Sequence, residues 1–236
     1  MRFRDRPSEL AHVPCLATEN TFFDGAADRI GCHVRRQVMA RGPLAFPGQR
    51  IGLLGGSFDP PHAGHMHVTR RAMKAVNLDA VWWLVSPGNP LKANGPADIE
   101  RRVRACRDLV DHPRVHVTDI ERYFGSSYTA NTLWRLSRRY RGVRFIWLMG
   151  ADNLASFHHW EDWQWIIETY PICVLARPGD QVHAGLSPAA QRYAEMRIPA
   201  SQAASLGRRK GAGWCLLTGP MSDTSSTRLR ADGVWS

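Results

Sequence analysis

From residue 50 onward, short apolar runs alternate with longer segments in which apolar residues recur every three or four positions. The runs are rich in Val, Ile, Leu and Trp, which is typical of strands that are covered on both faces. Repeated strand–helix units predict a doubly wound α/β domain, in which a parallel five-stranded sheet carries helices on both faces. The predicted strands are Ile51–Leu54, Ala80–Val85, Val115–Thr118, Arg144–Met149 and Ile172–Ala176.

Apolar stripes at helical spacing lie between these strands, over residues 68–76, 99–110 and 129–140. Asp98 directly precedes the second stripe, where its side chain is placed to cap the helix. Ser187 followed by Pro188 predicts the start of a later helix, with a cap and then proline at the first helical position. Ligands of such sheets bind at the carboxyl ends of the strands, so the turns there are the places to look for chemistry.

The turn after the first predicted strand carries the most informative chemistry. It reads Gly55-Gly56-Ser57-Phe58-Asp59-Pro60-Pro61-His62-Ala63-Gly64-His65. Adjacent glycines let backbone N–H groups approach an anion, and a helix that begins nearby directs its N–H groups at the same place. Two imidazoles can donate hydrogen bonds to phosphoryl oxygens as charge builds on them. The turn therefore predicts a triphosphate site; the alternative is a glycine-rich turn with a surface His62 and a helix-capping His65.

The chain has 236 residues and a formal net charge of +10, which fits either a nucleic-acid binder or an enzyme that handles small polyanions. We favour the enzyme, because no nucleic-acid motif is present and the arginines are dispersed along predicted helices as solvated faces. The arginines in question are Arg101, Arg102, Arg104 and Arg107 on one helix and Arg138, Arg139 and Arg141 on another.

Five scattered cysteines without a Cys-x-x-Cys pair indicate reduced intracellular thiols, and no apolar run is long enough to cross a bilayer. We therefore expect a cytoplasmic protein that contacts no membrane. Residues 1–46 have no sustained period and do not resemble a secretory signal. We expect them to be a poorly ordered extension, with Met39 as a plausible alternative start, ahead of a domain over residues 47–236.

The turn resembles the nucleotidyltransferase superfamily that carries a His-x-Gly-His signature, here at residues 62–65. The residues before it narrow the resemblance to bacterial nicotinate-nucleotide adenylyltransferases, which often have Thr in place of Ser57. The resemblance covers residues 50–230 and implies a Rossmann-like nucleotidyltransferase fold. It implies catalytic roles for His62 and His65, and ATP binding by Gly55, Gly56, Ser57 and Phe58.

Residues 225–230 resemble the second signature of that family, Ser-x-Thr-x-x-Arg. The resemblance assigns Ser225 and Thr227 to ATP and a catalytic role to Arg230. Two hydroxyls and helix N-terminal amides can hold phosphates, and an arginine three residues on lies on the same side of the helix. The alternative is an ordinary helix start.

The resemblance adds three more contacts to ATP, at Gly150, Asp152 and Arg177. Gly150 and Asp152 follow the predicted strand that ends at Met149. Alternatives are that Asp152 caps the next helix or helps to hold a hydrated magnesium ion, and that Arg177 is a surface arginine.

For the second substrate, the resemblance points to Lys92, Tyr128, Thr129 and Trp160. An indole face is a suitable platform for a flat pyridine ring. Alternatively, Trp160, Trp163 and Ile167 form a core-facing stripe, which we favour for Trp163. Thr129 is equally suited to be a helix N-cap. Leu91 stands where many relatives have histidine, so this chain departs from the family pattern next to Lys92.

The resemblance implies transfer of AMP from ATP to nicotinic acid mononucleotide, which gives nicotinic acid adenine dinucleotide and pyrophosphate in NAD biosynthesis. ATP and nicotinic acid mononucleotide are the expected partners, without nucleic acid; Mg²⁺ enters with ATP and needs no dedicated protein cage. The sequence leaves the oligomeric state open. The alternatives are a sister enzyme that acts on phosphopantetheine, FMN or another phosphate acceptor, and a non-catalytic nucleotide sensor.

Overall fold

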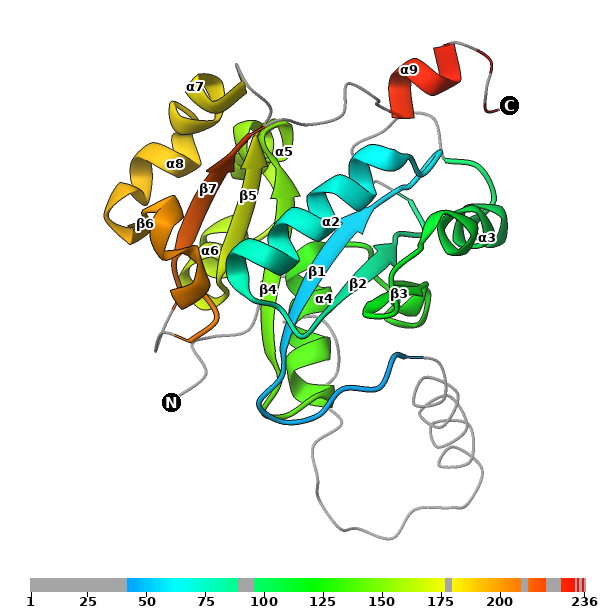
Figure 1. Cartoon of the computed structure of the whole chain (residues 1–236), viewed down its shortest axis with the longest axis horizontal. Coiled ribbons are helices and arrows are strands. Elements are labelled where there is room, and N and C mark those ends of the chain that lie inside the picture. Colours follow the sequence, from blue (N-terminus) through cyan, green and yellow to red (C-terminus); the bar gives the residue numbers. More distant parts are fainter. Residues whose placement is uncertain are drawn as a thin grey trace, which may run out of the picture.

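The computed structural model describes residues 42–88, 96–176, 180–208, 212–219, 226–231, 233 and 235. Its centre is a parallel sheet of seven strands in the order β3-β2-β1-β4-β5-β7-β6 (Figure 1). The predicted α/β class is confirmed. The strands are β1 Arg50–Gly56, β2 Ala80–Val85, β3 Val115–Thr118, β4 Arg144–Gly150, β5 Ile172–Ala176, β6 Arg197–Ile198 and β7 Trp214–Thr218.

The sheet has two strands more than the predicted five. Strand β6 is only two residues long, too short for a hydrophobic pattern to reveal it. Strand β7 is an apolar run whose first four residues are buried, and it pairs in parallel with β5 and β6. Its sequence resembles that of the other central strands, so the expectation of five strands overlooked a signal that was present.

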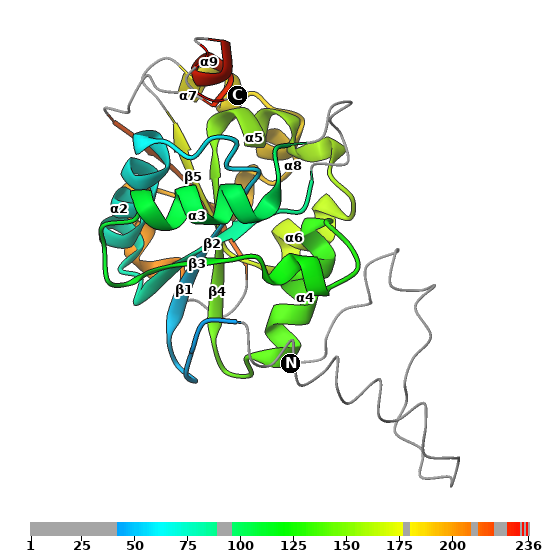
Figure 2. The ribbon, with the colours of Figure 1, turned by 90° about the vertical axis from the view of Figure 1, so that its right-hand side faces the viewer.

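Helices cover both faces of the sheet, as predicted. Figure 2 shows α2 on one side of the strands and α4 and α6 on the other. The α-helices are α2 Ala63–Val76, α3 Ile99–Leu109, α4 Thr129–Arg139, α5 Ala151–Ser156, α6 Trp163–Thr169, α7 Asp180–Gly185, α8 Pro188–Arg192 and α9 Ser226–Ala231. Short 3₁₀ helices are η2 Ile120–Tyr123, η3 Phe157–His159, η4 Ala194–Met196 and η5 Ala200–Ser205.

The two faces of the sheet carry separate apolar layers. Consecutive strand residues alternate between them, so Leu53 and Trp82 belong to one layer whereas Leu54 and Trp83 belong to the other. The first layer includes side chains from α4, α5 and α6, and the second includes side chains from α2, α3 and η5. This alternation explains why the strands are apolar along their whole length.

The predicted helix starts are largely confirmed. The Asp98 carboxylate accepts hydrogen bonds from the N–H groups of Glu100 and Arg101, and Ser187 caps α8 ahead of Pro188. The alternative that Thr129 is an N-cap is wrong, because Tyr128 occupies the cap position and Thr129 is the first helical residue.

Only the last part of the predicted extension lies within the described residues. There the Tyr140 hydroxyl donates to the Pro43 carbonyl at 3.1 Å, and Ala45 packs against the core. Residues 1–41 lie outside the described residues, so the division at residue 46 stays a prediction. In the described part of the chain, no helix combines the length and the apolar character needed to span a bilayer.

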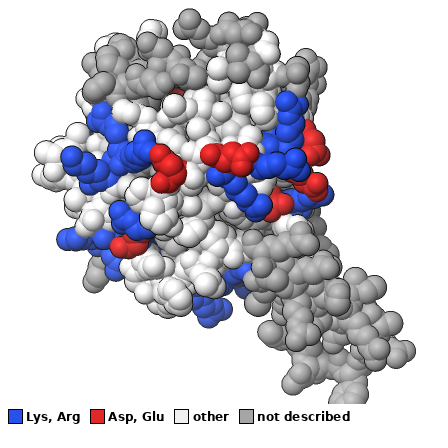
Figure 3. Space-filling view, turned by 45° about the vertical axis from the view of Figure 1, so that its right-hand side comes forward, with Lys and Arg blue, Asp and Glu red and all other residues white. Residues whose placement is uncertain are grey.

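Charged side chains of both signs lie close together on the face that Figure 3 shows. Two ion pairs of exposed residues illustrate the mixing, Arg70 with Asp111 and Arg122 with Glu100. Arg101, Arg104 and Arg107 are exposed, as predicted for a solvated helix face.

The prediction was wrong for Arg102, which is only 1% exposed. This residue lies three positions after Ile99 and four before Cys106, so helical geometry places it on the buried stripe of α3.

Candidate active site

The predicted site lies where the chain leaves the carboxyl ends of β1 and β4. These strands are neighbours at the centre of the sheet. After β1 the chain enters α2, which packs with one apolar layer, and after β4 it enters α5, which packs with the other. This is the switch point of a doubly wound sheet, where the turns diverge and leave space for a ligand.

The turn after β1 is fixed by close packing. A Cβ atom on Gly55 would lie 2.5 Å from the Trp147 indole, so only glycine allows β4 to place that ring there. Phe58 has a positive φ of 48°, and its buried ring stacks on Trp83 with centroids 5.0 Å apart. The backbone from Gly55 to Phe58 therefore has one well-defined course.

His62 and His65 form a reciprocal cap at the start of α2. The Gly64 N–H donates to His62 Nδ1, and the His62 N–H donates to His65 Nδ1, each at 3.1 Å. Because each Nδ1 accepts a hydrogen bond, the hydrogen of each neutral ring must sit on Nε2. The capping role suggested for His65 is thus real, and it places the ring hydrogen of each neutral imidazole on Nε2.

The His65 ring is enclosed by aromatic neighbours. Its centroid lies 3.9 Å from that of His62, 4.8 Å from Phe58 and 5.8 Å from Trp83. Burial, with a further contribution from His62, lowers the pKa of His65 to about 3. At neutral pH the ring is therefore uncharged and can act as a hydrogen-bond donor through Nε2.

The C-terminal helix α9 contacts the loop that leads to His62. The Ser226 hydroxyl donates to the Pro60 carbonyl at 2.8 Å. Arg230 donates to the Asp59 carbonyl and lies 3.8 Å from the Asp59 carboxylate. The two predicted signatures, from distant parts of the chain, therefore meet.

Gly150 and Asp152 lie at the carboxyl end of β4, as predicted. Gly150 is the N-cap residue of α5, and a Cβ atom there would collide with Asp152 Oδ1. The Asp152 side chain is exposed and makes no capping hydrogen bond to α5. The structure therefore gives no support to the alternative that Asp152 is a helix cap.

Trp160 follows the short helix η3 and is half-buried. Its ring makes edge contacts with Phe157 and Trp147, with centroids 5.3 Å and 6.3 Å apart. Trp163 is also half-buried and packs edge-on against Phe157 and Tyr193. Both indoles thus contact the core, and the Trp160–Trp147 contact connects Trp160 to the same indole that covers Gly55.

Tyr128 and Thr129 mark the start of α4 and are half-buried. Tyr128 supplies no side-chain cap, and its N–H contacts the Ser126 hydroxyl at 3.3 Å. Of the remaining predicted residues, Thr227 lies in α9, whereas Lys92, Arg177 and Ser225 lie outside the described residues.

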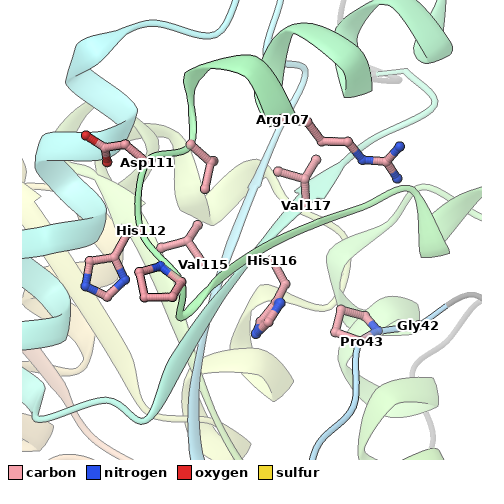
Figure 4. Close-up of a pocket in the computed structure, with 10 residues that line it drawn as sticks. Gly42, Pro43, Arg107, Asp111, His112, Val115, His116 and Val117 are labelled. Atoms are coloured by element: carbon pink, nitrogen blue, oxygen red, sulfur yellow. The ribbon is translucent and has the colours of Figure 1, made fainter.

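Two hollows in the described surface lie away from these residues. The larger, about 610 Å³, runs beside the edge strand β3 between Arg107, His116 and Pro43 (Figure 4). The second lies between α3 and η2 and is lined by Arg104, Asp119 and other residues. Neither is lined by a residue predicted for the site, so neither supports its placement.

Sequence reasoning missed the inner residues of the turn. Asp59 is buried, and its carboxylate accepts a hydrogen bond from Trp235 Nε1 at 2.7 Å in addition to its contact with Arg230. Arg102 donates to the Ser57 carbonyl at 2.6 Å. The helical spacing of Arg102 was the one signal that could have revealed its burial.

Residues 53–232 match the family model described as Cytidylyltransferase-like. The probable nicotinate-nucleotide adenylyltransferase of Ruegeria pomeroyi is 60% identical over 194 residues, which cover 82% of this chain and 91% of that protein. The protein with the same description from Cereibacter sphaeroides strain ATCC 17023 is 58% identical, over 78% of this chain and 98% of its own length.

Among solved structures, Plasmodium falciparum nicotinic acid mononucleotide adenylyltransferase complexed with NaAD aligns with a TM-score of 0.59. The alignment covers 78% of this chain and 83% of that chain at 14% identity, so the likeness is one of fold alone. The sequence matches place the chain in the cytidylyltransferase-like family and, within that family, among the nicotinate-nucleotide adenylyltransferases.

Proposed function

We propose that the protein transfers AMP from MgATP to nicotinic acid mononucleotide, which gives nicotinic acid adenine dinucleotide and pyrophosphate. One observation carries the proposal: α9 lies against the loop that leads to His62, through Ser226 on Pro60 and Arg230 on Asp59. Imidazole, amide and guanidinium donors from distant parts of the chain are thereby gathered beside one turn. The relatives named as nicotinate-nucleotide adenylyltransferases support the choice of acceptor.

The reaction needs no group that creates a nucleophile. The attacking atom is a phosphate oxygen of nicotinic acid mononucleotide, which is already ionised at neutral pH. It forms a bond to the α-phosphorus of ATP while the bond from that phosphorus to the bridging oxygen of the β-phosphate breaks. The electron pair leaves with pyrophosphate, so the task of the protein is to align two anions and to stabilise developing charge.

The donors of the site fit this task. His62 and His65 present Nε2–H groups, because their Nδ1 atoms are occupied by the capping hydrogen bonds. We assign His65 to the α-phosphate, with His62 and the backbone of Gly55–Phe58 completing the cradle. Arg230 is assigned to the departing pyrophosphate. Mg²⁺ enters as part of the ATP complex, held by phosphate oxygens and water.

We place the pyridine nucleotide between Trp160 and the start of α4. The indole of Trp160 offers a flat surface for the ring, and the first N–H groups of α4, at Thr129 and Ala130, suit the nicotinate carboxylate. A carboxylate gains from the positive end of the helix, whereas the neutral amide of nicotinamide mononucleotide does not. This difference favours the acid over the amide as acceptor.

The test is pyrophosphate release from MgATP with separate acceptors: nicotinic acid mononucleotide, nicotinamide mononucleotide, phosphopantetheine and FMN. The proposal expects release with nicotinic acid mononucleotide and formation of the acid dinucleotide, detected by mass. Release only with another acceptor would identify a sister enzyme, and no release with any acceptor would favour a nucleotide sensor. His65→Ala protein prepared in the same way controls for contaminating transferases.

A further inference from the structure

Arg102 is a buried cation outside the set of residues assigned above. It lies on α3 and is only 1% exposed. Burial lowers the pKa of its guanidinium, and the nearby Asp59 carboxylate partly offsets the effect. A buried charge is costly unless hydrogen bonds replace its lost water. The hydrogen-bond partners of Arg102 therefore indicate its role in the structure.

Its guanidinium binds main-chain carbonyls from three separate segments. Nε donates to Ala97 at 2.6 Å, just ahead of α3, and Nη1 donates to Ser86 at 2.8 Å, just after β2. Nη1 also donates to the Ser57 carbonyl at 2.6 Å, and Nη2 lies 3.5 Å from the Pro87 carbonyl. Ser86 follows β2 and Ala97 precedes α3. Ser57 lies in the turn between β1 and α2, which we call the phosphate turn.

The contact with Ser57 fixes the direction of a peptide group. In a planar trans peptide, the C=O and the following N–H point in opposite directions. Because Arg102 holds the Ser57 carbonyl on the interior side, the N–H of Phe58 must point away from Arg102. The Phe58 ring is buried between Trp83 and His65, with centroid distances of 5.0 Å and 4.8 Å, so the residue cannot turn to relax a flipped peptide.

We propose that Arg102 is a positioning residue for the phosphate turn: its buried guanidinium orients the Ser57–Phe58 peptide so that the Phe58 N–H faces the transferred phosphate. This inference rests on the proposed function. It adds to the site a residue that lies in neither signature, because the orientation of the Phe58 amide depends on Arg102, 45 positions from Ser57 in the chain.

The test compares Arg102→Ala and Arg102→Lys with the wild type. Each is assayed well below its melting temperature, with the folded fraction measured by circular dichroism. We expect Arg102→Ala to lower kcat per folded molecule by ~10²-fold, the scale for losing one donor to the transition state. Arg102→Lys keeps the charge but lacks the planar fork, so its loss should be intermediate and should keep the test usable if the alanine variant does not fold. Added methylguanidine should restore part of the activity of Arg102→Ala and leave Arg102→Lys unchanged.

Arg104→Ala is the matched control, because this arginine is exposed on the same helix. It should retain the kcat of the wild type. If Arg102→Ala or Arg102→Lys loses thermal stability but keeps the wild-type kcat and KM per folded molecule, Arg102 is only structural and the inference fails.

Failure of the proposed function gives a different pattern. If the wild type releases no pyrophosphate with any acceptor, that proposal fails, and Arg102 is then tested by calorimetric titration with MgATP. A tenfold or greater loss of affinity in the folded Arg102 variants would support the positioning role. Equal affinity in variant and wild type would overturn it.

Discussion

Arg230 donates a hydrogen bond to the main-chain carbonyl of Asp59 and lies 3.8 Å from the Asp59 carboxylate, although 171 positions separate them in the chain. Asp59 belongs to the turn that leads to His62, and Arg230 ends the second signature. The contact orients a cation beside the proposed phosphate site. Trp235 Nε1 binds the same carboxylate, and the Arg101 guanidinium lies 4.0 Å from the centre of the Trp235 ring, so the C-terminal segment is held at several points.

Arg230→Ala should lower kcat per folded molecule by ~10²-fold. The arginine is expected to stabilise the departing pyrophosphate, and because its partner Asp59 is buried, kinetics per folded molecule must separate this effect from lost stability. Steady-state kinetics and calorimetry measure the two effects. Arg208→Ala, an exposed arginine, is the control; a normal kcat in Arg230→Ala would remove this residue from the mechanism.

His65→Ala should lower kcat by ~10²–10³-fold, because it removes a donor to the α-phosphate. It also opens the reciprocal cap of α2, which should cost about 1 kcal/mol of unfolding free energy. Kinetics corrected for the folded fraction separates the effects. His112→Ala, which alters a histidine in the turn between α3 and β3, should leave kcat unchanged.

The pH dependence of stability gives a second test of His65. Its pKa is lowered to about 3 in the folded protein, so between that value and 6.5 the unfolded chain binds a proton that the folded chain does not. The free energy of unfolding is therefore highest above pH 6.5 and falls as the pH drops from 6.5 toward 3, because the unfolded chain gains a proton on His65. Urea unfolding from pH 5 to 8 should show a smaller pH dependence for His65→Ala than for the wild type; equal slopes would contradict the lowered pKa.

Glu121 should give an effect of the opposite sign. This side chain is 4% exposed and accepts a hydrogen bond from Thr132, and burial raises its pKa to about 7. The folded protein keeps a proton that the unfolded chain releases near pH 4.5, so stability falls as pH rises from 4.5 through 7.

The variant Glu121→Gln keeps the shape and removes the titration. Its stability relative to the wild type should increase by up to about 3 kcal/mol between pH 4.5 and pH 7.5, measured by urea unfolding. Glu100→Gln, in which an exposed carboxyl is replaced, should show no such trend. A flat difference for Glu121→Gln would mean that Glu121 is ionised in the folded state.

Trp160→Ala should raise KM for nicotinic acid mononucleotide more than it lowers kcat, because stacking is expected to be equal in the ground and transition states. Trp163→Ala, its neighbour in the same aromatic cluster, should mainly lower the melting temperature. Initial rates with the pyridine nucleotide varied at saturating ATP distinguish the two. If Trp160→Ala has an unchanged KM and a lower melting temperature, Trp160 has only a structural role in the core.

Gly150→Ala should lower kcat/KM for ATP, because the added methyl group would displace the Asp152 carboxylate from the end of β4. We expect kcat/KM for ATP to fall by roughly tenfold or more, as expected when a positioned contact is displaced. Gly185→Ala introduces the same methyl group where no atom lies within 4 Å and is the control. Equal kcat/KM for both variants would show that Asp152 is not needed in its present place.

The features that could be predicted from sequence are those encoded locally. The five predicted strands are close to the observed ones, because a buried parallel strand needs apolar residues on both faces, and Asp98 and Ser187 are caps that act on adjacent residues. The two-residue β6 carries no such pattern. The positions of the first signature were predictable, since its turn and helix start are contiguous.

Contacts between distant residues were not predictable in the same way. The sequence offered no sign that Asp59 would receive both Arg230 and Trp235, because this depends on where α9 lies in space. Arg102 shows the intermediate case: its spacing on α3 indicated burial, but its carbonyl partners lie in segments that only the folded chain brings together.

The two apolar layers have a consequence for how heat inactivates the protein. His62 and His65 are carried by a helix of one layer, and Trp160 and the start of α4 by elements of the other. Loosening either layer would separate one half of the proposed site from the other. The temperature at which turnover ceases should therefore report the weaker layer and lie below the temperature at which strand structure melts.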